Sequence, residues 1–349
     1  MSQPRAYLDW NATAPLRPEA RAAMAEAMEV LGNPSSVHAE GRTARALIER
    51  ARARIAAAAG AEGAEIVFTS GATEAAALAL RGRGLAASGI EHDCVAAWTE
   101  ERLPVGHDGR VAVEDPGASV LQAANSETGI LQDLPPGLAF TDAVQAFGKI
   151  PFAFDWTEAE AAAISAHKIG GPAGVGALLL RPGSSCEALL RGGGQEQGRR
   201  AGTENLIGIA GFAAAAEAAA ADLARGIWDE VAENRNTLEK ALEAGGSPII
   251  LVGKDGRRLP NTSLVVVPGW KGETQVMQMD LAGFAVSAGS ACSSGKVRAS
   301  RVLRAMGFDG EAAASALRLS IGPATRRDEV LRFAEAWTRQ LRRRAARAA

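Results

Sequence analysis

Short apolar segments that alternate with helical segments are the feature that most limits how this chain can fold. Five segments in the first half of its 349 residues predict strands, at 64–70, 118–125, 137–143, 161–165 and 176–181. A helical segment follows the first of them directly, at "GATEAAALALRG". Strands that alternate with helices predict an α/β fold with a mostly parallel sheet.

The second half of the chain begins with a long alanine-rich segment. It predicts a helix from Gly211 to Arg225 that continues after a break at Gly226. Further on, the sequence predicts strands at 261–267 and 284–290, a helix that leads into a strand within 310–322, and a last helix at 326–347. The glycine-rich segment 191–205 predicts a mobile loop, and residue 225 is a plausible domain boundary.

Composition and charge limit the possible partners. An apolar fraction of 47%, a charged fraction of 22% and a net charge of -2 fit a globular protein without a strong preference for nucleic acid. No apolar run reaches the roughly 18 residues of a membrane span, and the N-terminus lacks a signal-peptide core. We therefore expect a cytoplasmic protein with no membrane partner and no direct nucleic-acid binding. The basic C-terminal tail is expected to be a solvated helix end.

The cysteines are too few and too far apart for a disulfide framework. Cys94, Cys186 and Cys292 form no CxxC pair, so we predict no zinc site and three reduced thiols. Cys94 and Cys186 are expected to be structural. A special role for a thiol requires special surroundings, and glycine and serine lie on both sides of Cys292.

Polar groups follow three of the predicted strands. Gly71 and Thr73 open the first helix, Asp142 follows the strand at 137–143, and Lys168 follows the strand at 161–165. Each has an ordinary explanation as a helix cap or a solvated strand end. Ligands of parallel sheets bind at the carboxyl ends of strands, where a phosphate site, a carboxylate and a lysine amine would meet. Together they predict a Schiff base between Lys168 and pyridoxal phosphate.

Longer motifs occur in the same order along nearly the whole chain. They are "YLDWNATAPL", "GNPSSVHAEGR", "VFTSGATEAAALA", "ANSETGILQD", "TDAVQAFGK", "SAHKIGGPAGVGAL", "GGGQEQGRRAGTEN", "SAGSACSSG", "VLRAMG" and "LRLSIG". In these motifs the chain resembles the cysteine desulfurases of the class V aminotransferase superfamily, of the type with a long catalytic loop. The S-x-H-K and S-x-G-S-A-C-[ST]-S patterns are the most specific.

The resemblance implies a fold-type I pyridoxal-phosphate enzyme that acts as a homodimer. A large cofactor-binding domain would span residues 16–225, with a mostly parallel central sheet. A smaller α+β domain would combine residues 1–15 and 226–349 and carry the catalytic cysteine loop. Two stretches, between Thr73 and Asn125 and between Ile130 and Asp142, are shorter than is usual in the family, so we expect a trimmed large domain.

The resemblance also implies a role for each matching residue. Lys168, Cys292 and His92 would be catalytic: the lysine holds the cofactor and shuttles a proton, the cysteine accepts sulfur, and the histidine stacks on the ring. Arg318 and Asn33 would bind the substrate carboxylate. The expected cofactor contacts are Ala72, Thr73, Ser126, Asp142, Gln145, Ser165, His167, Lys168 and, from the partner subunit, Thr203. Asn11 is expected to support the entrance to the site.

The implied reaction converts L-cysteine to L-alanine and leaves a persulfide on Cys292. A sulfur-accepting scaffold or carrier protein would then receive the sulfur, in iron–sulfur cluster assembly or in thiolation. Two alternatives remain within the fold, a selenocysteine lyase and a class V aminotransferase, and a third is a non-catalytic scaffold. The thiol of Cys292 argues against transamination, which needs none.

Two substitutions depart from the family pattern inside these motifs. Ser126 stands where the family has a second asparagine that reaches the cofactor ring oxygen, so Ser126 must make that contact with a shorter side chain or leave it to Gln145. Gln197 stands where the family usually has arginine. We expect both to affect rate and partner choice more than reaction type.

Overall fold

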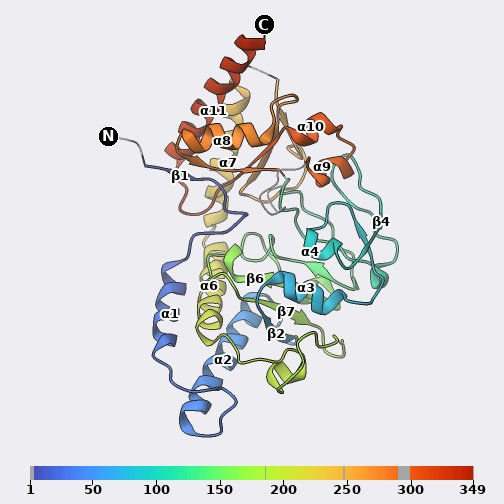
Figure 1. Cartoon of the computed structure of the whole chain (residues 1–349), viewed down its shortest axis with the longest axis vertical. Helices are drawn as coiled ribbons and strands as arrows, with labels where there is room; N and C mark the ends of the chain where they lie inside the picture. The colour runs from blue at the N-terminus through green and yellow to red at the C-terminus, as the bar shows by residue number, and fades with distance from the viewer. Residues whose placement is uncertain (1–3, 185, 247, 290–298, 349) are drawn as a thin grey trace.

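The computed structural model of the chain describes residues 4–184, 186–246, 248–289 and 299–348. Its elements form two groups, one above the other in the view of Figure 1. The lower group is built on a large sheet with the long helices α1 (Pro18–Met28), α2 (Ala39–Ala58) and α6 (Leu206–Ala224) along one side. The upper group contains a smaller sheet, and both ends of the chain lie there.

The large sheet has four strands in hydrogen-bonded order β2-β7-β6-β5. They are β2 (Glu65–Thr69), β7 (Gly176–Leu180), β6 (Ala161–Ser165) and β5 (Thr141–Asp142). Parallel bridges extend it, from Phe140 to Val120 and from Ser119 to Ala86. Ala86 belongs to β3 (Ala86–Ser88), which pairs in parallel with β4 (Glu100–Leu103).

Strand direction places the carboxyl ends of this sheet at one edge. β7 runs antiparallel to both of its neighbours, so β2 and β6 run the same way. The remaining pairings, from β6 to β5 and on to β3 and β4, are all parallel. The prediction of a mostly parallel sheet is therefore confirmed, and the ends of β2, β5 and β6 meet where a ligand of such a sheet binds.

Two apolar layers enclose the large sheet. α2 and α6 contribute Ile55, Ile209 and Phe212 to a cluster on one face, with Ile66 and Phe68 of β2. On the other face, α3 (Ala72–Leu80) packs against β6 and β7. β6 is buried over its whole length, which explains why its sequence, "AAAIS", shows no polar alternation. The short helices nearby are α4 (Asp93–Ala96), α5 (Phe154–Thr157) and the 3-10 turns Pro116–Ala118, Ala166–Lys168 and Gln195–Gly198.

The upper group has its own core around an antiparallel sheet. Its order is β11-β12-β9-β8, with β11 (Ser287–Ala288), β12 (Ala316–Ser320), β9 (Thr262–Val266) and β8 (Ile250–Leu251). β1 (Ala6–Tyr7) pairs in parallel with β10 (Phe284–Ala285) beside it. The helices are α7 (Ile227–Glu243), α8 (Gly272–Leu281), α9 (Arg301–Ala305), α10 (Gly310–Ala314) and α11 (Arg327–Ala348).

One core cluster joins the start of the chain to this upper group. Ala6 and Leu8 are fully buried with Trp228 of α7 and Trp337 of α11. This cluster supports the proposed small domain of residues 1–15 and 226–349. Gly226, with φ of 72°, separates α6 from α7 at the predicted break.

Within the described part of the chain, α6 alone is long and apolar enough by composition to cross a membrane. The expectation that no segment reaches that length is corrected here. More than half of the α6 segment, 61%, is buried, and α6 contacts α1 and α2 as a core helix. Its acidic residues pair with neighbouring arginines, Glu217 with Arg54 and Asp222 with Arg17. A buried core helix with these ion pairs is weak evidence for a membrane.

Two predicted strands differ in the structure. The strand predicted at 284–290 divides at Val286: Phe284 and Ala285 join β1, whereas Ser287 and Ala288 join β12 of the other sheet. The strand predicted at 118–125 forms only isolated bridges. Beyond it, the backbone turns back through the Asn125 N–H to Ile130 carbonyl bond, which limits its length. The sequence pattern identified both segments, but it did not indicate which strands each of them would pair with.

The glycine-rich segment 191–205 was predicted to be mobile, but ion pairs hold it. Glu196 accepts from Arg52 of α2 at 2.9 and 3.0 Å and from the Phe68 backbone N–H of β2 at 2.8 Å. Arg199 binds both carboxylate oxygens of Glu65, at 2.5 and 2.6 Å. Glycines prevent regular structure here, but charged side chains fix the path.

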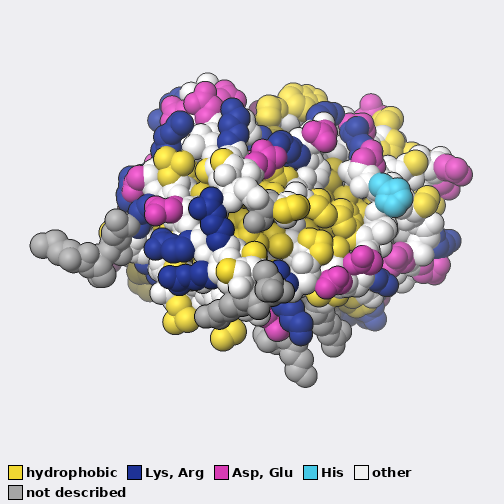
Figure 2. Space-filling model, turned by 90° about the horizontal axis from the view of Figure 1, so that it is seen from above, with side chains coloured by type: hydrophobic (Ala, Val, Ile, Leu, Met, Phe, Trp, Pro, Cys, Tyr) yellow, Lys and Arg dark blue, Asp and Glu magenta, His cyan; other side chains and the backbone are white. Residues whose placement is uncertain are grey.

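Positive charge gathers near the C-terminal end of the chain. Arg339, Arg342 and Arg343 of α11 are exposed. The face seen in Figure 2 carries Lys and Arg side chains grouped to one side of an apolar region, with acidic side chains around it. This mixture fits the solvated helix end that the sequence predicts.

Candidate active site

Lys168 ends the turn that follows β6. Its Nζ donates to the backbone carbonyl oxygens of Asn11 at 2.7 Å and Ala12 at 2.9 Å. The N-terminal segment therefore crosses the carboxyl end of the large sheet and meets the lysine there. The amine is hydrogen-bonded within the molecule and the residue is half-buried, which supports the chemical interpretation of Lys168 over that of a solvated strand end.

Asp142 lies at the end of β5, next to β6. Its side chain is buried, and its Oδ1 accepts from the Val144 N–H at 2.9 Å. Burial raises the pKa of Asp142, while the charges of His92 and Lys168 act in the opposite direction. Three of the predicted site residues thus lie close enough to interact electrostatically.

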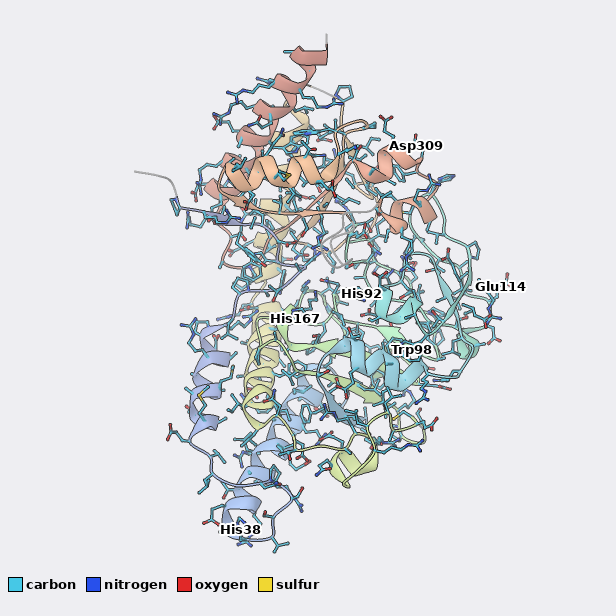
Figure 3. The ribbon with its side chains drawn as sticks, in the orientation of Figure 1. His38, His92, Trp98, Glu114, His167 and Asp309 are labelled. Carbon is cyan, nitrogen blue, oxygen red and sulfur yellow. The ribbon has the colours of Figure 1, made fainter. Side chains whose placement is uncertain are left out.

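His92 caps the N-terminus of α4. Its Nδ1 accepts from the Cys94 N–H at 3.2 Å and lies 3.0 Å from the Cys94 Sγ. Figure 3 shows His92 and His167 on the same side of the large sheet, facing the upper group. The cap explains how a short "EHDC" segment places the imidazole at the site.

The phosphate-binding residues gather around the start of α3. Gly71 is the cap of this helix and offers no side-chain acceptor for its first N–H groups, those of Ala72 and Thr73. A Cβ on Gly176 of β7 would lie 2.8 Å from the Gly71 Cα, so glycine is required for the turn to approach the sheet this closely. Such a turn suits a phosphate group.

Ser165 and His167 flank the same edge from β6. Ser165 is buried at the end of the strand, and the His167 Nδ1 lies 3.2 Å from the Thr13 Oγ1. Burial lowers the pKa of His167 to about 4, and the positive charges of Lys168 and Lys149 act in the same direction. His167 is therefore neutral at physiological pH.

Arg318 of β12 reaches the site from the upper group. The side chain is buried, and it donates to the Asp9 Oδ1 at 2.8 Å and the Ser126 carbonyl at 3.1 Å. Its Nε is buried without a hydrogen-bond partner. An unpaired guanidinium N–H is costly, so the site has a donor available for a further acceptor such as a carboxylate.

Glu127 lies between Arg318 and the segment that contains Cys292. Its Oε2 accepts from the Ser300 hydroxyl at 2.6 Å, and a Cβ on Gly289 would lie 3.3 Å from the same oxygen. Burial raises the pKa of Glu127 to about 7, against the hydrogen bond from Ser300 and the charges of Arg318 and Arg301. Cys292 itself lies outside the described residues, but the two described ends of its segment meet at Glu127.

Asn33 lies away from this cluster within one chain, whereas Thr203 lines a small cavity with Thr69 and Ser70, directly before the phosphate turn. Asn33 packs against Gly41 in the first turn of α2, and its Oδ1 accepts from the Ser35 N–H at 2.9 Å. Figure 3 shows His38, the cap of α2, at the lower end of the molecule and His92 near its middle. The structure therefore does not bring Asn33 and Arg318 together within one chain. Thr203 is exposed, and the cavity that it lines has a volume of about 130 Å³.

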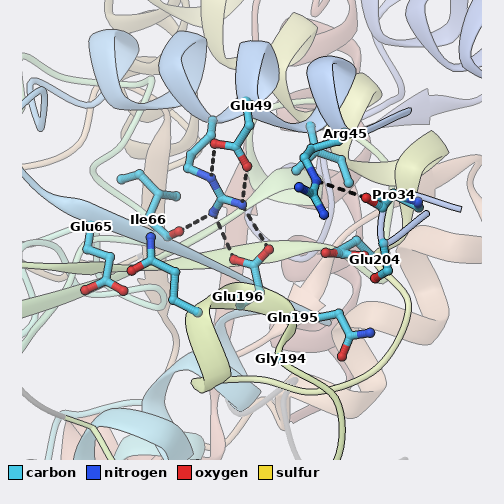
Figure 4. Close-up of a pocket in the computed structure, with 13 residues that line it drawn as sticks. Pro34, Arg45, Glu49, Glu65, Ile66, Gly194, Gln195, Glu196 and Glu204 are labelled. Atoms are coloured by element: carbon cyan, nitrogen blue, oxygen red, sulfur yellow. Dashed lines mark hydrogen bonds and ion pairs between the residues drawn. The ribbon is translucent and has the colours of Figure 1, made fainter. Parts of the chain in front are cut away.

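A larger cavity, of about 430 Å³, lies next to the smaller one and shares Glu196 and Glu204 with its lining (Figure 4). α2 and the glycine-rich segment form its walls, and the Arg52–Glu196 ion pair crosses it. Gln197, the second departure from the family pattern, lines this cavity with a backbone φ of 56°. The cavity is separate from Lys168, so its size does not mark the chemistry.

The other two thiols have local partners. Cys94 contacts the His92 Nδ1, as described above. The Cys186 Sγ accepts from Arg199 NH1 at 3.7 Å, and burial raises the pKa of this thiol. Both thiols are half-buried, in keeping with the structural role that the sequence predicts.

The sequence motifs assigned no role to Lys149 and only a supporting role to Asn11. Lys149 is fully buried, and its amine donates to the Asn11 Oδ1 at 3.1 Å and to the Gln145 Oε1. Burial holds its pKa well below the usual range, as do the charges of Lys168 and Arg318. The signal was present, because a lysine in the apolar "AVQAFGKI" segment is unusual, but its partner at Asn11 is 138 residues away.

Comparison with known proteins agrees with this geometry. The sequence model of the aminotransferase class-V family matches residues 6–99 and 118–333. It passes over residues 100–117, which lie in the first of the two stretches expected to be trimmed. In the structure they contain the exposed edge strand β4 and the bridged pair Val105 and Val111.

Named relatives cover almost the whole chain. The chain is 40% identical to a cysteine desulfurase of Cereibacter sphaeroides, over 95% of this chain and 94% of the relative. It is 36% identical to the cysteine desulfurase IscS of Dictyoglomus turgidum, over 93% and 91%. A solved NifS-like protein of Rickettsia africae superposes with a TM-score of 0.87 at 30% identity, over 96% of this chain and 99% of the other. The chain belongs to the class-V aminotransferases and, within this pyridoxal-phosphate-dependent family, to the cysteine desulfurases.

Proposed function

We propose that this protein is a pyridoxal-phosphate-dependent cysteine desulfurase that converts L-cysteine to L-alanine and receives the sulfur on Cys292. The observation that carries the proposal is the meeting of Lys168, Asp142 and His92 at the carboxyl edge of the large sheet. The desulfurase relatives, at up to 40% identity over most of the chain, support the same reaction.

The residues of this edge fit the cofactor. The first-turn N–H groups of α3, with Ser165 and His167, would hold the phosphate, and Asp142 would pair with the ring nitrogen. Ser126 and Gln145 would face the ring oxygen. When bound, the cofactor supplies an electron-accepting ring that stabilises negative charge at the substrate Cα.

The chain's own groups would handle the protons and the sulfur. Lys168 would anchor the cofactor and then carry the Cα proton, since its amine lies at the site and is held by two carbonyl oxygens. His92 would stack on the ring and hold a proton. The Cys292 thiolate would attack the substrate sulfur, so that the Cβ–S bond breaks, its electron pair stays on Cβ and protonation gives alanine.

Arg318 would bind the substrate carboxylate. Its unpartnered Nε supports this role, because a buried guanidinium gains most from a charged acceptor. Asn33 could act on the same group only from a second copy of the chain, since it lies at the far end of α2 in its own chain.

We also propose the location of the protein, its oligomeric state and its sulfur acceptor. The protein would act as a cytoplasmic homodimer, with Thr203 of each chain at the cofactor phosphate of the other, and the exposure of Thr203 supports this. A scaffold or carrier protein would take the sulfur for iron–sulfur cluster assembly or thiolation. The relative named IscS supports the general class of partner.

The test is direct. Purified protein with pyridoxal phosphate, L-cysteine and a reductant should release sulfide and form alanine in equal amounts. A selenocysteine lyase would leave L-cysteine largely unused and would release selenide only when selenocysteine is supplied, an aminotransferase would form a keto acid, and a scaffold would do neither. Either of the first two product patterns, or no product from yellow protein, would contradict the proposal.

A further inference from the structure

Lys149 is a buried amine to which the proposed reaction assigns no role. The residue is 2% exposed, in the turn after β5, and its Nζ donates to the Gln145 Oε1 and the Asn11 Oδ1. An amine loses much hydration when it is buried, so a hydrophobic residue would serve a purely packing role at lower cost. The contacts of Lys149 point instead to the side chain of Gln145.

The amide of Gln145 is held at both ends. Its Oε1 accepts from Lys149, and its Nε2 donates to the Asn11 carbonyl oxygen at 3.0 Å. A carboxamide can rotate by half a turn and exchange its oxygen with its nitrogen. The Lys149 amine donates to the oxygen end, and the Asn11 backbone carbonyl can only accept, so the two contacts together select the rotamer with the oxygen toward Lys149 and the NH2 group away from it.

The NH2 group then faces the site. The same Asn11 carbonyl oxygen accepts from Lys168 Nζ at 2.7 Å, so the Gln145 NH2 group and the Lys168 amine lie around one oxygen atom. An NH2 group has two hydrogens, and Asn11 uses one of them. The second is available for an acceptor on the cofactor that Lys168 holds.

We propose that Lys149 is a positioning residue that fixes the Gln145 amide with its NH2 group toward the 3′-oxygen of the bound cofactor. This inference rests on the proposed function. It explains why a lysine is buried at this position, and it says which way the Gln145 amide faces. With Ser126 in place of the longer family residue, the donor from Gln145 is the more important one at that oxygen.

The visible spectrum of the loaded enzyme reports on this hydrogen bond. A donor at the 3′-oxygen stabilises its negative charge, which is greatest after the yellow form has lost its proton. Loss of the donor should therefore raise the pH at which half of the yellow band is lost. Lys149→Met should raise this midpoint by about one pH unit, as expected for one hydrogen bond to a charged group.

A double substitution separates positioning from charge. Lys149→Met also removes a nearby amine, which could raise the midpoint without any change in Gln145. In a Gln145→Met background, positioning predicts that Lys149→Met adds almost nothing, whereas a charge effect adds its full shift. Additive shifts would overturn the proposal. Lys240→Met, at an exposed position of α7, is the matched control and should leave the midpoint unchanged.

A second variant covers the case in which Lys149→Met does not fold. Gln145→Met removes the NH2 group without adding a charge, because an added charge would by itself raise the midpoint. The proposal predicts a raised midpoint for this variant as well, and an unchanged midpoint would show that the NH2 group does not face the ring. Wild-type protein that stays colourless with pyridoxal phosphate would instead refute the proposed function, so the two failures are distinguishable.

Discussion

At the scale of single residues, Glu91 is the carboxyl group that the fold encloses most tightly beside the site. Its Oε1 accepts from the Gln122 N–H at 2.9 Å, its Oε2 has no partner, and the residue is 1% exposed. Burial raises the pKa of Glu91 from 4.5 to about 8. The folded protein therefore holds this group protonated at neutral pH, next to His92 in the chain.

A stability measurement against pH should detect this proton. The contribution of Glu91 is fully present below its unfolded pKa of 4.5 and is lost as pH rises through about 8. Glu91→Gln removes the ionisation, so we expect its stability relative to wild type to increase between pH 5 and pH 9, by a few kcal/mol. Urea unfolding midpoints at both pH values measure this, with exposed Glu114→Gln as control. An equal difference at both pH values would contradict it.

Cys292→Ser should separate cofactor binding from sulfur transfer. Serine is nearly isosteric but is not ionised at neutral pH, so it cannot attack the substrate sulfur. The variant should bind pyridoxal phosphate and respond to L-cysteine in its spectrum, while sulfide release falls by a factor on the order of a hundred or more. Mass spectrometry should find a persulfide on Cys292 in wild type and none on Cys94 or Cys186. Near-normal sulfide release from the variant would exclude this thiol as acceptor.

Residue roles could be predicted from sequence where one short motif carries the group. Lys168 and Asp142 follow predicted strands, so local order was sufficient to indicate a site, whereas the role of His92 came only from the family resemblance. The roles of Asn11 and Lys149 could not be predicted in this way, because the side-chain contacts of Asn11 join residues 115 to 251 positions away. Such contacts exist only after the N-terminal segment has crossed the sheet.

At the scale of elements, the glycine-rich segment is attached to the large sheet through Glu196. This carboxylate is almost fully buried and binds Arg52 of α2 and the backbone of β2. The attachment positions Thr203 a few residues later, which is the part of the segment proposed to act on the partner subunit. Stability of the segment and assembly of the site are therefore linked.

Glu196→Gln should weaken this attachment. It removes the charge that Arg52 faces and leaves the guanidinium with the more exposed Glu49. We expect a loss of about 2 kcal/mol in unfolding free energy, at the low end for a broken buried pair because Glu49 remains. Glu187→Gln, which breaks the exposed pair with Arg191, is the control and should cost little. Equal losses in the two variants would show that burial does not matter here.

The boundaries of an element could be predicted where a local feature of the sequence determines them. The break at Gly226, where φ is positive, and the buried strand β6 were predicted because a glycine and an unbroken apolar run are local features of the sequence. The division of 284–290 between two sheets has no such signal, because each half chooses its partner by tertiary contact.

At the scale of the whole molecule, the proposed homodimer places residues of two chains in each site. Light scattering should give twice the chain mass of 36.0 kDa. Hybrids of wild type with Lys168→Ala should keep about half of the wild-type activity, since one lysine remains. Hybrids of wild type with a Lys168→Ala, Thr203→Asp chain should lose nearly all of it, because the added charge would enter the intact site. Half activity in both hybrids would show that Thr203 serves its own chain.

The N-terminal segment ties the beginning of the chain to its end, and this has a consequence for synthesis. Ala6 and Leu8 pack with α7 and α11, and Asp9 pairs with Arg318, so these residues find their partners in elements that are synthesised much later. On the ribosome the large sheet can form early, whereas residues 6–12 must wait until β12 and α11 emerge. Lys168 depends on Asn11 and Ala12 for its hydrogen bonds. The nascent chain should therefore be unable to organise its reactive lysine until β12 and α11 have been synthesised.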